Sequence, residues 1–242
     1  MKKRDRILVN EKFKDLVSFK ELGYEVVDSD SFGTFLTKPN GDILNRILYE
    51  LHDSYGTELN ISSIHYSFIA PQVNQVLMSL YSVPSLSGLK IGLSSIIEHT
   101  ISYKSTIEEF ENFWKPITLI KIEEDGFFYE ERLIEASELF IKYMDQYMNP
   151  FFESITSLQE INNKIVDGFP EDKWRDFFHG ETRFKVTVIM KLCNNPRYET
   201  FSQTSKEMMY SLFYNKGVAE YEGYYKIYCV LLDYLEEGTF NS

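Results

Sequence analysis

Apolar residues recur at different spacings along the chain, which divides it into a mixed first third and a helical remainder. Over residues 5–22 they are three to four positions apart, which predicts a helix that ends at Gly23. Residues 24–27 and 32–36 are short runs rich in β-branched and aromatic side chains, which favour extended backbone. We therefore expect a first helix followed by two strands.

An Asn40-Gly41 step lies between two apolar runs, and both residues tolerate a positive φ angle. This step predicts a β-hairpin. Residues 43–52 would be the returning strand, although Ile47-Leu48 also suits a helix. Residues 57–68 alternate imperfectly and predict another strand. The N-terminal third should therefore contain a small antiparallel sheet.

Helical periodicity dominates after Pro71, which should begin a helix. Two later helices should end at prolines, one at Pro116 and one at Pro150. Residues 83–102 are ambiguous between a loop with one strand and a short helix, and residues 183–193 fit a helix or a strand. The helices predicted beyond Pro71 cover residues 105–114, 128–148, 158–166, 170–178, 205–214 and 218–235.

These elements predict an α+β fold, in which a small antiparallel sheet from the N-terminal third packs with a mostly helical C-terminal part. We place the boundary between residues 1–103, a helix plus antiparallel strands, and residues 104–242, the helical part. Both should form one compact unit. The last helix carries two adjacent apolar stripes rich in tyrosine, so it should pack on two neighbours and keep its hydroxyls at the edge of the buried face.

The composition is that of a folded protein, with 242 residues, 43% hydrophobic and 16% aromatic. Cys193 and Cys229 each lie in an apolar helical pattern, which predicts two buried free thiols. No apolar stretch has the length of a signal peptide or of a membrane span. We therefore expect a cytoplasmic protein with no membrane partner.

The formal net charge of -12 is unevenly distributed. Residues 1–20 hold 7 basic and 3 acidic side chains, whereas residues 21–170 hold 9 basic and 23 acidic ones. The balance argues against a nucleic-acid partner. The acid is densest between Glu108 and Glu138, which indicates either a solvated surface or a docking surface for a basic protein. The candidate partner-binding residues are Glu108, Glu109, Glu111, Glu123, Glu124, Asp125, Glu130 and Glu131.

Sequence motifs of catalysis are absent. The four histidines form no zinc-binding pair, Gly92 to Ile96 is not a nucleophile elbow, and no phosphate-binding loop follows Gly88. The acidic run at Glu123 lacks the alternating ligands of a calcium loop. We predict no catalytic residue, no metal and no cofactor. Two alternatives stay open: an enzyme whose Glu, His and Tyr residues are scattered in sequence, and a helical scaffold that dimerises through its last helix.

The chain resembles a broad set of small bacterial proteins of unknown function that includes immunity proteins of polymorphic toxin systems. The similarity rests on a first helix with Phe13 and Phe19, the Gly23-Tyr24 step, the β-rich residues 32–68 and the acidic helical half. The resemblance implies a cytoplasmic, non-enzymatic protein that masks a toxin by direct contact. An acidic inhibitor of a basic nuclease would fit that implication.

Overall fold

The structure is a computed structural model that describes residues 3–29, 33–54, 58–86, 101–102, 107–119, 121–123, 130–178, 180–218 and 220–238. The α+β class is confirmed, because strands between residues 25 and 69 form an antiparallel sheet and most of the later described residues are helical. The chain divides into two compact units. Unit 1 is Met1–Phe68 with Tyr103–Thr156, and unit 2 is Ile69–Ser102 with Ser157–Ser242.

This division differs from a single boundary near residue 103. The chain leaves unit 1 at the end of its fourth strand and returns at Tyr103, because the helices up to Thr156 pack with the first helix and the sheet. The helix that begins at Pro71 instead packs against a helix of the C-terminal segment. The division into two units therefore follows from contacts between helices that are far apart in the sequence.

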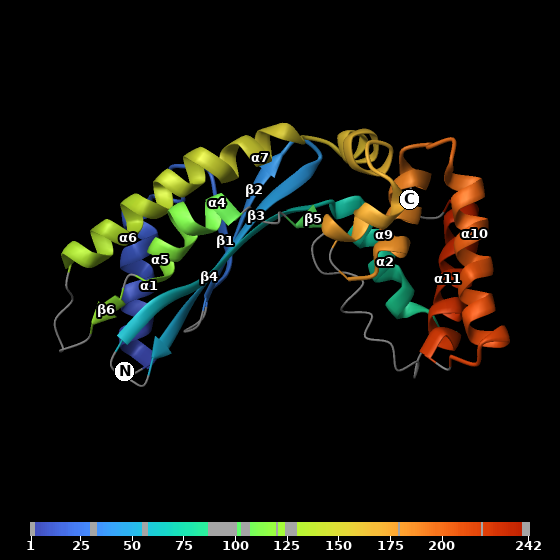
Figure 1. Cartoon of the computed structure of the whole chain (residues 1–242), viewed down its shortest axis with the longest axis horizontal. Helices are drawn as coiled ribbons and strands as arrows, with labels where there is room; N and C mark the ends of the chain where they lie inside the picture. Colours follow the sequence, from blue (N-terminus) through green and yellow to red (C-terminus); the bar gives the residue numbers. More distant parts are fainter. Residues whose placement is uncertain are drawn as a thin grey trace. The chain divides into compact units, whose positions relative to one another are not determined.

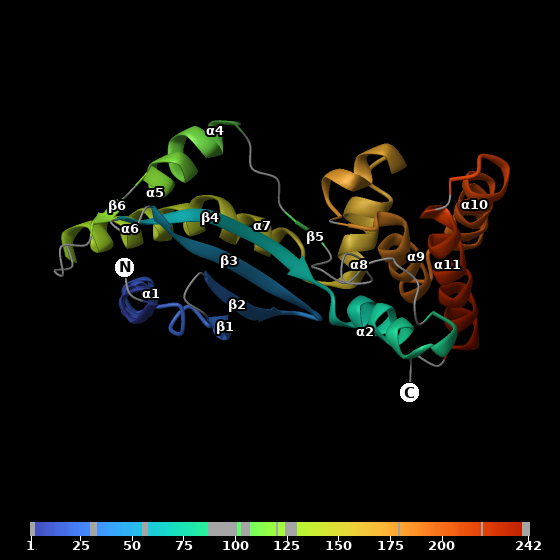
Figure 2. The ribbon, with the colours of Figure 1, turned by 90° about the horizontal axis from the view of Figure 1, so that it is seen from below.

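The first four strands of unit 1 are labelled in Figure 1, and they are neighbours in the sheet in chain order, as Figure 2 shows. The second and third strands pair antiparallel with Asn40 opposite Ile43, so Gly41 and Asp42 form a two-residue turn. Gly41 has φ +63°, as the first central residue of a type II′ turn requires. The predicted hairpin is confirmed, and residues 43–52 are strand. The strands are β1 (Glu25–Ser29), β2 (Gly33–Asn40), β3 (Ile43–Ser54), β4 (Glu58–Ile69) and β6 (Lys121–Glu123), which pairs antiparallel with β4.

Helices of unit 1 cover the buried side chains of this sheet. The first helix, α1, ends at Val17 and not near residue 22, because Ser18 has a left-handed φ of 57°. Figure 1 shows α6 and α7 in line along the sheet. The helical segments are α1 (Lys3–Val17), α4 (Ile107–Glu109), the π-helical turn η3 (Phe110–Trp114), α5 (Lys115–Leu119), α6 (Glu130–Tyr143), the π-helical turn η4 (Met144–Met148) and α7 (Asn149–Ser154).

The expectation that Pro116 and Pro150 end their helices is wrong. Pro116 is the second residue of α5 and Pro150 the second residue of α7, and each of these helices directly follows a π-helical turn. Proline lacks an N–H donor and clashes with the carbonyl four residues before it in a regular α-helix. The wider π turn changes the hydrogen-bond spacing at that point, so the helix continues.

Aromatic rings form the core of unit 1. Phe140 of α6 lies 5.6 Å from Phe13 of α1 and 5.9 Å from Tyr49 of β3, measured between ring centroids. The hydroxyl of Tyr49 donates to Asn10 Oδ1 at 2.9 Å, and Asn10 Nδ2 donates to Thr34 Oγ1 at 2.7 Å. Burial raises the pKa of Tyr49. These buried groups join one helix to two strands, with their polar atoms hydrogen-bonded.

Unit 2 is organised around α9, in which seven consecutive residues, 184–190, are buried. A helix that is buried on all sides needs neighbours all round, and α2, α10 and α11 all contact it. Residues 183–192 are therefore helix. The segments are α2 (Pro71–Ser79), the 3₁₀ turns η1 (Leu80–Ser82), η2 (Pro84–Leu86) and η6 (Glu171–Asp176), β5 (Ile101–Ser102), α8 (Leu158–Ile161), the π turns η5 (Asn162–Val166) and η7 (Ser211–Asn215), α9 (Thr182–Leu192), α10 (Tyr198–Tyr210) and α11 (Glu220–Glu237).

The last helix, α11, packs on both α9 and α10, as its two apolar stripes predict, and Figure 2 shows it beside α10. Tyr228 differs from the expectation for tyrosines in this helix, because it is fully buried and shares a 2.6 Å hydrogen bond with Thr187 Oγ1. Cys193 and Cys229 are free but partly exposed, so the prediction of buried thiols is wrong. Of residues 83–102, those from 87 to 100 lie outside the described part of the chain.

The end of α9 offers a test of backbone strain. Asn194 has φ 51° and follows the last helical turn, where Asn195 N–H donates to Met190 O at 2.8 Å and Asn194 N–H donates to Lys191 O at 3.1 Å. These two bonds form a Schellman motif, whose left-handed position favours glycine. We expect Asn194→Gly to raise the free energy of unfolding by about 0.5 kcal/mol and Asn194→Val to lower it by about 1 kcal/mol. Urea denaturation measures both, and a loss of stability in the glycine variant would contradict the prediction.

Candidate functional site

The acidic residues that the sequence predicted for partner binding have different surroundings. Glu108, Glu111 and Glu131 are exposed, whereas Glu109 is buried. Glu123 is the last residue of β6 and Glu130 the first residue of α6. Glu124 and Asp125 lie outside the residues that the structure describes. Three of the eight are therefore placed at the surface.

Glu109 has no exposed surface, so the expectation that it belongs to a docking surface is wrong. Its Oε1 accepts hydrogen bonds from the hydroxyls of Tyr143 at 2.7 Å and Tyr66 at 3.0 Å. Buried carboxyl groups need such partners. Glu109 directly precedes Phe110 and lies four residues before Phe113, so it is next to the apolar face of its helical segment. This position was the one indication in the sequence that its side chain would be buried.

The acidic side chains do not gather at one point. Burial raises the pKa of Tyr147 in η4, and the nearby carboxylates of Glu108 and Glu109 raise it further. Glu109 bonds to Tyr143 at the end of α6, and the Phe113 ring lies 5.3 Å from the Tyr147 ring, measured between centroids. The segment that carries Glu108 therefore lies beside η4, while Glu131 lies in the first turn of α6. A helix rises about 1.5 Å per residue, so the Cα atoms of residues 131 and 147 are separated by about 24 Å along this axis. The surface around Glu131 is thus distinct from the surface around Glu108.

Exposed side chains on α6 form one continuous helix face. Glu131, Ile134, Glu135 and Glu138 are three and four residues apart, and all four are exposed. Ile134 is 38% exposed and lies between the acidic side chains, which the sequence pattern did not predict. None of the three carboxylates forms an ion pair with a residue that the structure describes. We call these four residues the α6 outer face.

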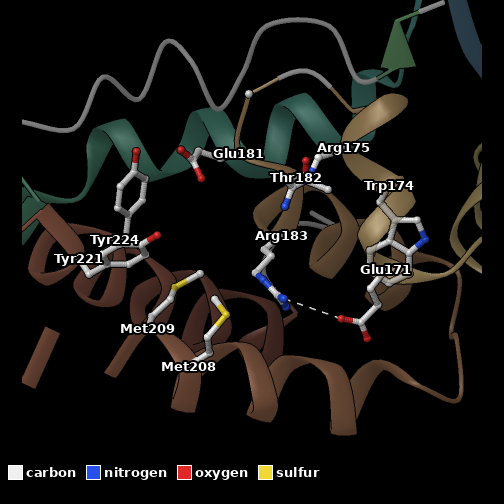
Figure 3. Close-up of a pocket in the computed structure, with 11 residues that line it drawn as sticks. Glu171, Trp174, Arg175, Glu181, Thr182, Arg183, Met208, Met209, Tyr221 and Tyr224 are labelled. Carbon is white, nitrogen blue, oxygen red and sulfur yellow. Dashed lines mark ion pairs between the residues drawn. The ribbon is translucent and has the colours of Figure 1, made fainter. Parts of the chain in front are cut away.

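A second candidate site is a cavity of about 560 Å³ in unit 2, drawn in Figure 3. Its walls come from η6, the start of α9, α10 and α11. The guanidinium of Arg183 lines it and is fixed by a 2.9 Å hydrogen bond from Nη1 to Ser205 Oγ. Glu171 Oε2 is 3.8 Å from Arg183 Nη2. The cavity therefore has a positioned cation in its wall.

Another part of the cavity wall is apolar. Tyr221 and Tyr224 of α11 have ring centroids 5.7 Å apart, and Met208 and Met209 of α10 lie near them in Figure 3. Glu181 lies at the same end of this view as Tyr224 and also lines the cavity. The lining residues are drawn from four separate stretches of sequence, so no local motif could have predicted this cavity. Tyr221 and Tyr224 belong to the two apolar stripes of α11, whose hydroxyls were expected at the edge of the buried face.

Within the described ranges, no three His, Cys, Asp or Glu side chains are grouped so that they could bind a metal ion. The helices of that part of the chain are also too short or too polar to cross a membrane. Comparisons of the chain with protein-family models, with curated proteins and with solved structures found no match. The α6 outer face and the cavity of unit 2 are therefore the two candidate sites.

Proposed function

We propose that this protein is a non-enzymatic binding protein that docks a basic protein partner on the α6 outer face. The observation that carries the proposal is the exposed Ile134 among three carboxylates that have no ion-pair partner in the described residues. Protein interfaces combine an apolar centre with a polar rim. Carboxylates in the rim speed the encounter with a positively charged surface and orient it.

The charge of the two units supports the placement of this surface in unit 1. The sequence of unit 1 holds 14 basic and 23 acidic side chains, whereas that of unit 2 holds 11 and 14. Most of the negative charge therefore belongs to the unit that contains α6. A basic partner would be attracted to unit 1 more strongly than to unit 2.

The finer proposal is that the protein is a cytoplasmic immunity protein and that its partner is a basic toxin. The resemblance of the N-terminal region to a set of bacterial proteins that includes immunity proteins supports this class of partner. Direct contact would cover the toxin, so inhibition would require no catalytic residue in this chain. A nuclease is a suitable target, because proteins that bind nucleic acids present basic surfaces.

Charge reversal on α6 tests the proposal. The triple variant Glu131→Lys, Glu135→Lys, Glu138→Lys should weaken binding to a basic protein encoded beside this gene by about 100-fold, because each lost attraction becomes a repulsion. Isothermal titration calorimetry with the purified pair measures the affinity. Ile134→Asn should weaken the same complex by about 10-fold through loss of apolar contact.

A matched control separates the α6 outer face from overall charge. The variant Asp172→Lys, Glu199→Lys, Asp233→Lys changes the net charge equally but alters exposed residues of unit 2. Its affinity should stay within about threefold of the unmodified protein. Equal losses in both triple variants would overturn the assignment to α6. Failure of every basic neighbouring gene product to bind would overturn the proposed function.

An enzyme is the alternative function, and the cavity of unit 2 is the observation that favours it. The cavity is lined by two carboxyl groups and two guanidinium groups, those of Glu171, Glu181, Arg175 and Arg183. Its described lining residues include no cysteine, histidine or lysine, so a catalytic role there would fall to Glu171 or Glu181 as general acid or base.

A further inference from the structure

We propose that the cavity of unit 2 is a binding site for a small organic monoanion with an aromatic or apolar body. Its volume of about 560 Å³ falls within the range of small-molecule sites, which is roughly 300–1,000 Å³. The anionic group of the ligand would bind Arg183. The apolar body would lie against the tyrosine and methionine side chains of α10 and α11.

Arg183 has donors to spare for an anion. A guanidinium carries five N–H groups, and that of Arg183 donates one hydrogen bond, to Ser205 Oγ at 2.9 Å. Glu171 is 3.8 Å away, which is an ion-pair distance but too long for a hydrogen bond. The ring of Phe201 supports the guanidinium from 5.6 Å. The Arg183 guanidinium is thus held in place while some of its N–H groups face the cavity.

Glu171 does not need to lose its charge partner when an anion binds. Its Oε1 lies 4.0 Å from Nη2 of Arg197, so this second arginine can keep the carboxylate paired. Arg175 also lines the cavity, and it forms no ion pair with a residue that the structure describes. An anion at Arg183 would therefore be attracted by both Arg183 and Arg175, and Glu171 would keep Arg197 as its partner.

The opposite part of the cavity selects the rest of the ligand. Tyr221 and Tyr224 offer aromatic faces, and Met208 and Met209 offer adaptable thioether side chains. Glu181 lies on this side in Figure 3 and has no ion-pair partner among the described residues. Its charge repels a second anionic group. We therefore infer a ligand with one negative charge and not a dianion.

A pair of fluorescent probes of nearly equal shape tests the site. Anilinonaphthalene sulfonate carries one negative charge, and phenylnaphthylamine has the same two ring systems without the sulfonate. The sulfonate probe should bind with one-to-one stoichiometry and at least about 10-fold more tightly than the neutral probe, because only its charge meets Arg183. Fluorescence titration measures both affinities. Equal affinity of the two probes would overturn the proposal.

Substitutions then locate the binding. Arg183→Gln should weaken the sulfonate probe by about 10-fold and the neutral probe by less than about threefold, whereas Arg183→Lys should fall between. Arg175→Gln should weaken binding of the sulfonate probe by about threefold, and the fold should stay intact because the Arg175 side chain is exposed. Circular dichroism checks that each variant is folded. Unchanged sulfonate affinity in both glutamine variants would overturn the assignment.

An exposed aromatic patch provides the control, because such probes also bind to apolar surfaces. Tyr214 is 54% exposed and lies outside the cavity lining. Tyr214→Ser should leave the sulfonate affinity within about twofold of its original value. If this substitution removes binding while Arg183→Gln does not, the probe binds to the surface patch and the cavity proposal fails.

Discussion

Replacing Phe140 by alanine is expected to lower the free energy of unfolding by about 3–5 kcal/mol, which is the usual cost of removing a buried phenyl ring. Phe140 has no exposed surface. Its ring lies within 6 Å of the rings of Phe13, Phe19 and Tyr49, so the substitution leaves a cavity between α1, α6 and β3. The close-packed aromatic neighbours limit how far the site can collapse.

Urea denaturation followed by circular dichroism measures the loss, and α6 supplies its own control. Ile134→Ala removes a large apolar side chain from the exposed face of the same helix. That change should alter the free energy of unfolding by less than about 0.5 kcal/mol. A cost below about 1 kcal/mol for Phe140→Ala, or equal costs for the two variants, would contradict the packing of this core.

Replacing Glu109 by leucine is expected to cost about 2–4 kcal/mol, because two buried tyrosine hydroxyls lose their hydrogen bonds to one carboxyl oxygen. Glu109→Gln keeps a carbonyl oxygen as an acceptor and should cost less. The neighbouring Glu108 is exposed, so Glu108→Leu should stay within about 0.5 kcal/mol of the original stability. Chemical denaturation of the three variants gives the comparison.

A double-mutant cycle tests the contact itself. Tyr143→Phe removes the hydroxyl that donates to Glu109 at 2.7 Å. Measured in the original protein and in the Glu109→Leu variant, the two substitutions should show a coupling energy of about 1–2 kcal/mol. Additive effects would mean that the hydrogen bond contributes nothing. The cycle therefore isolates this contact from the general cost of a change in the core.

Turn residues and alternating side chains predicted the sheet because both act locally. Gly41 occupies the one hairpin position with a positive φ, and Ile43, Ile47 and Tyr49 alternate onto the buried side of β3. The prolines misled the prediction for a related reason. Pro116 and Pro150 interrupt a regular α-helix, but the π turns before them depend on the surrounding packing and leave no simple sequence signature.

The candidate site residues also divide into those that the local sequence pattern predicted and those that depend on packing. Periodicity predicted a helix over the acid-rich residues that became α6, and its Glu131, Glu135 and Glu138 side chains are exposed. It could not show that Glu109 would meet two tyrosine hydroxyls. Those hydroxyls come from β4 and α6, and their approach depends on how three elements pack.

By itself, the sequence determined the α+β class, the hairpin at Gly41, the main helices and the concentration of negative charge before residue 170. Each of these follows from neighbouring residues or from simple counting. Tertiary structure alone decided the division into two units, the burial of Glu109 and the cavity at Arg183. These depend on which helix and sheet faces meet, and the residues that meet are often more than 30 positions apart in the chain.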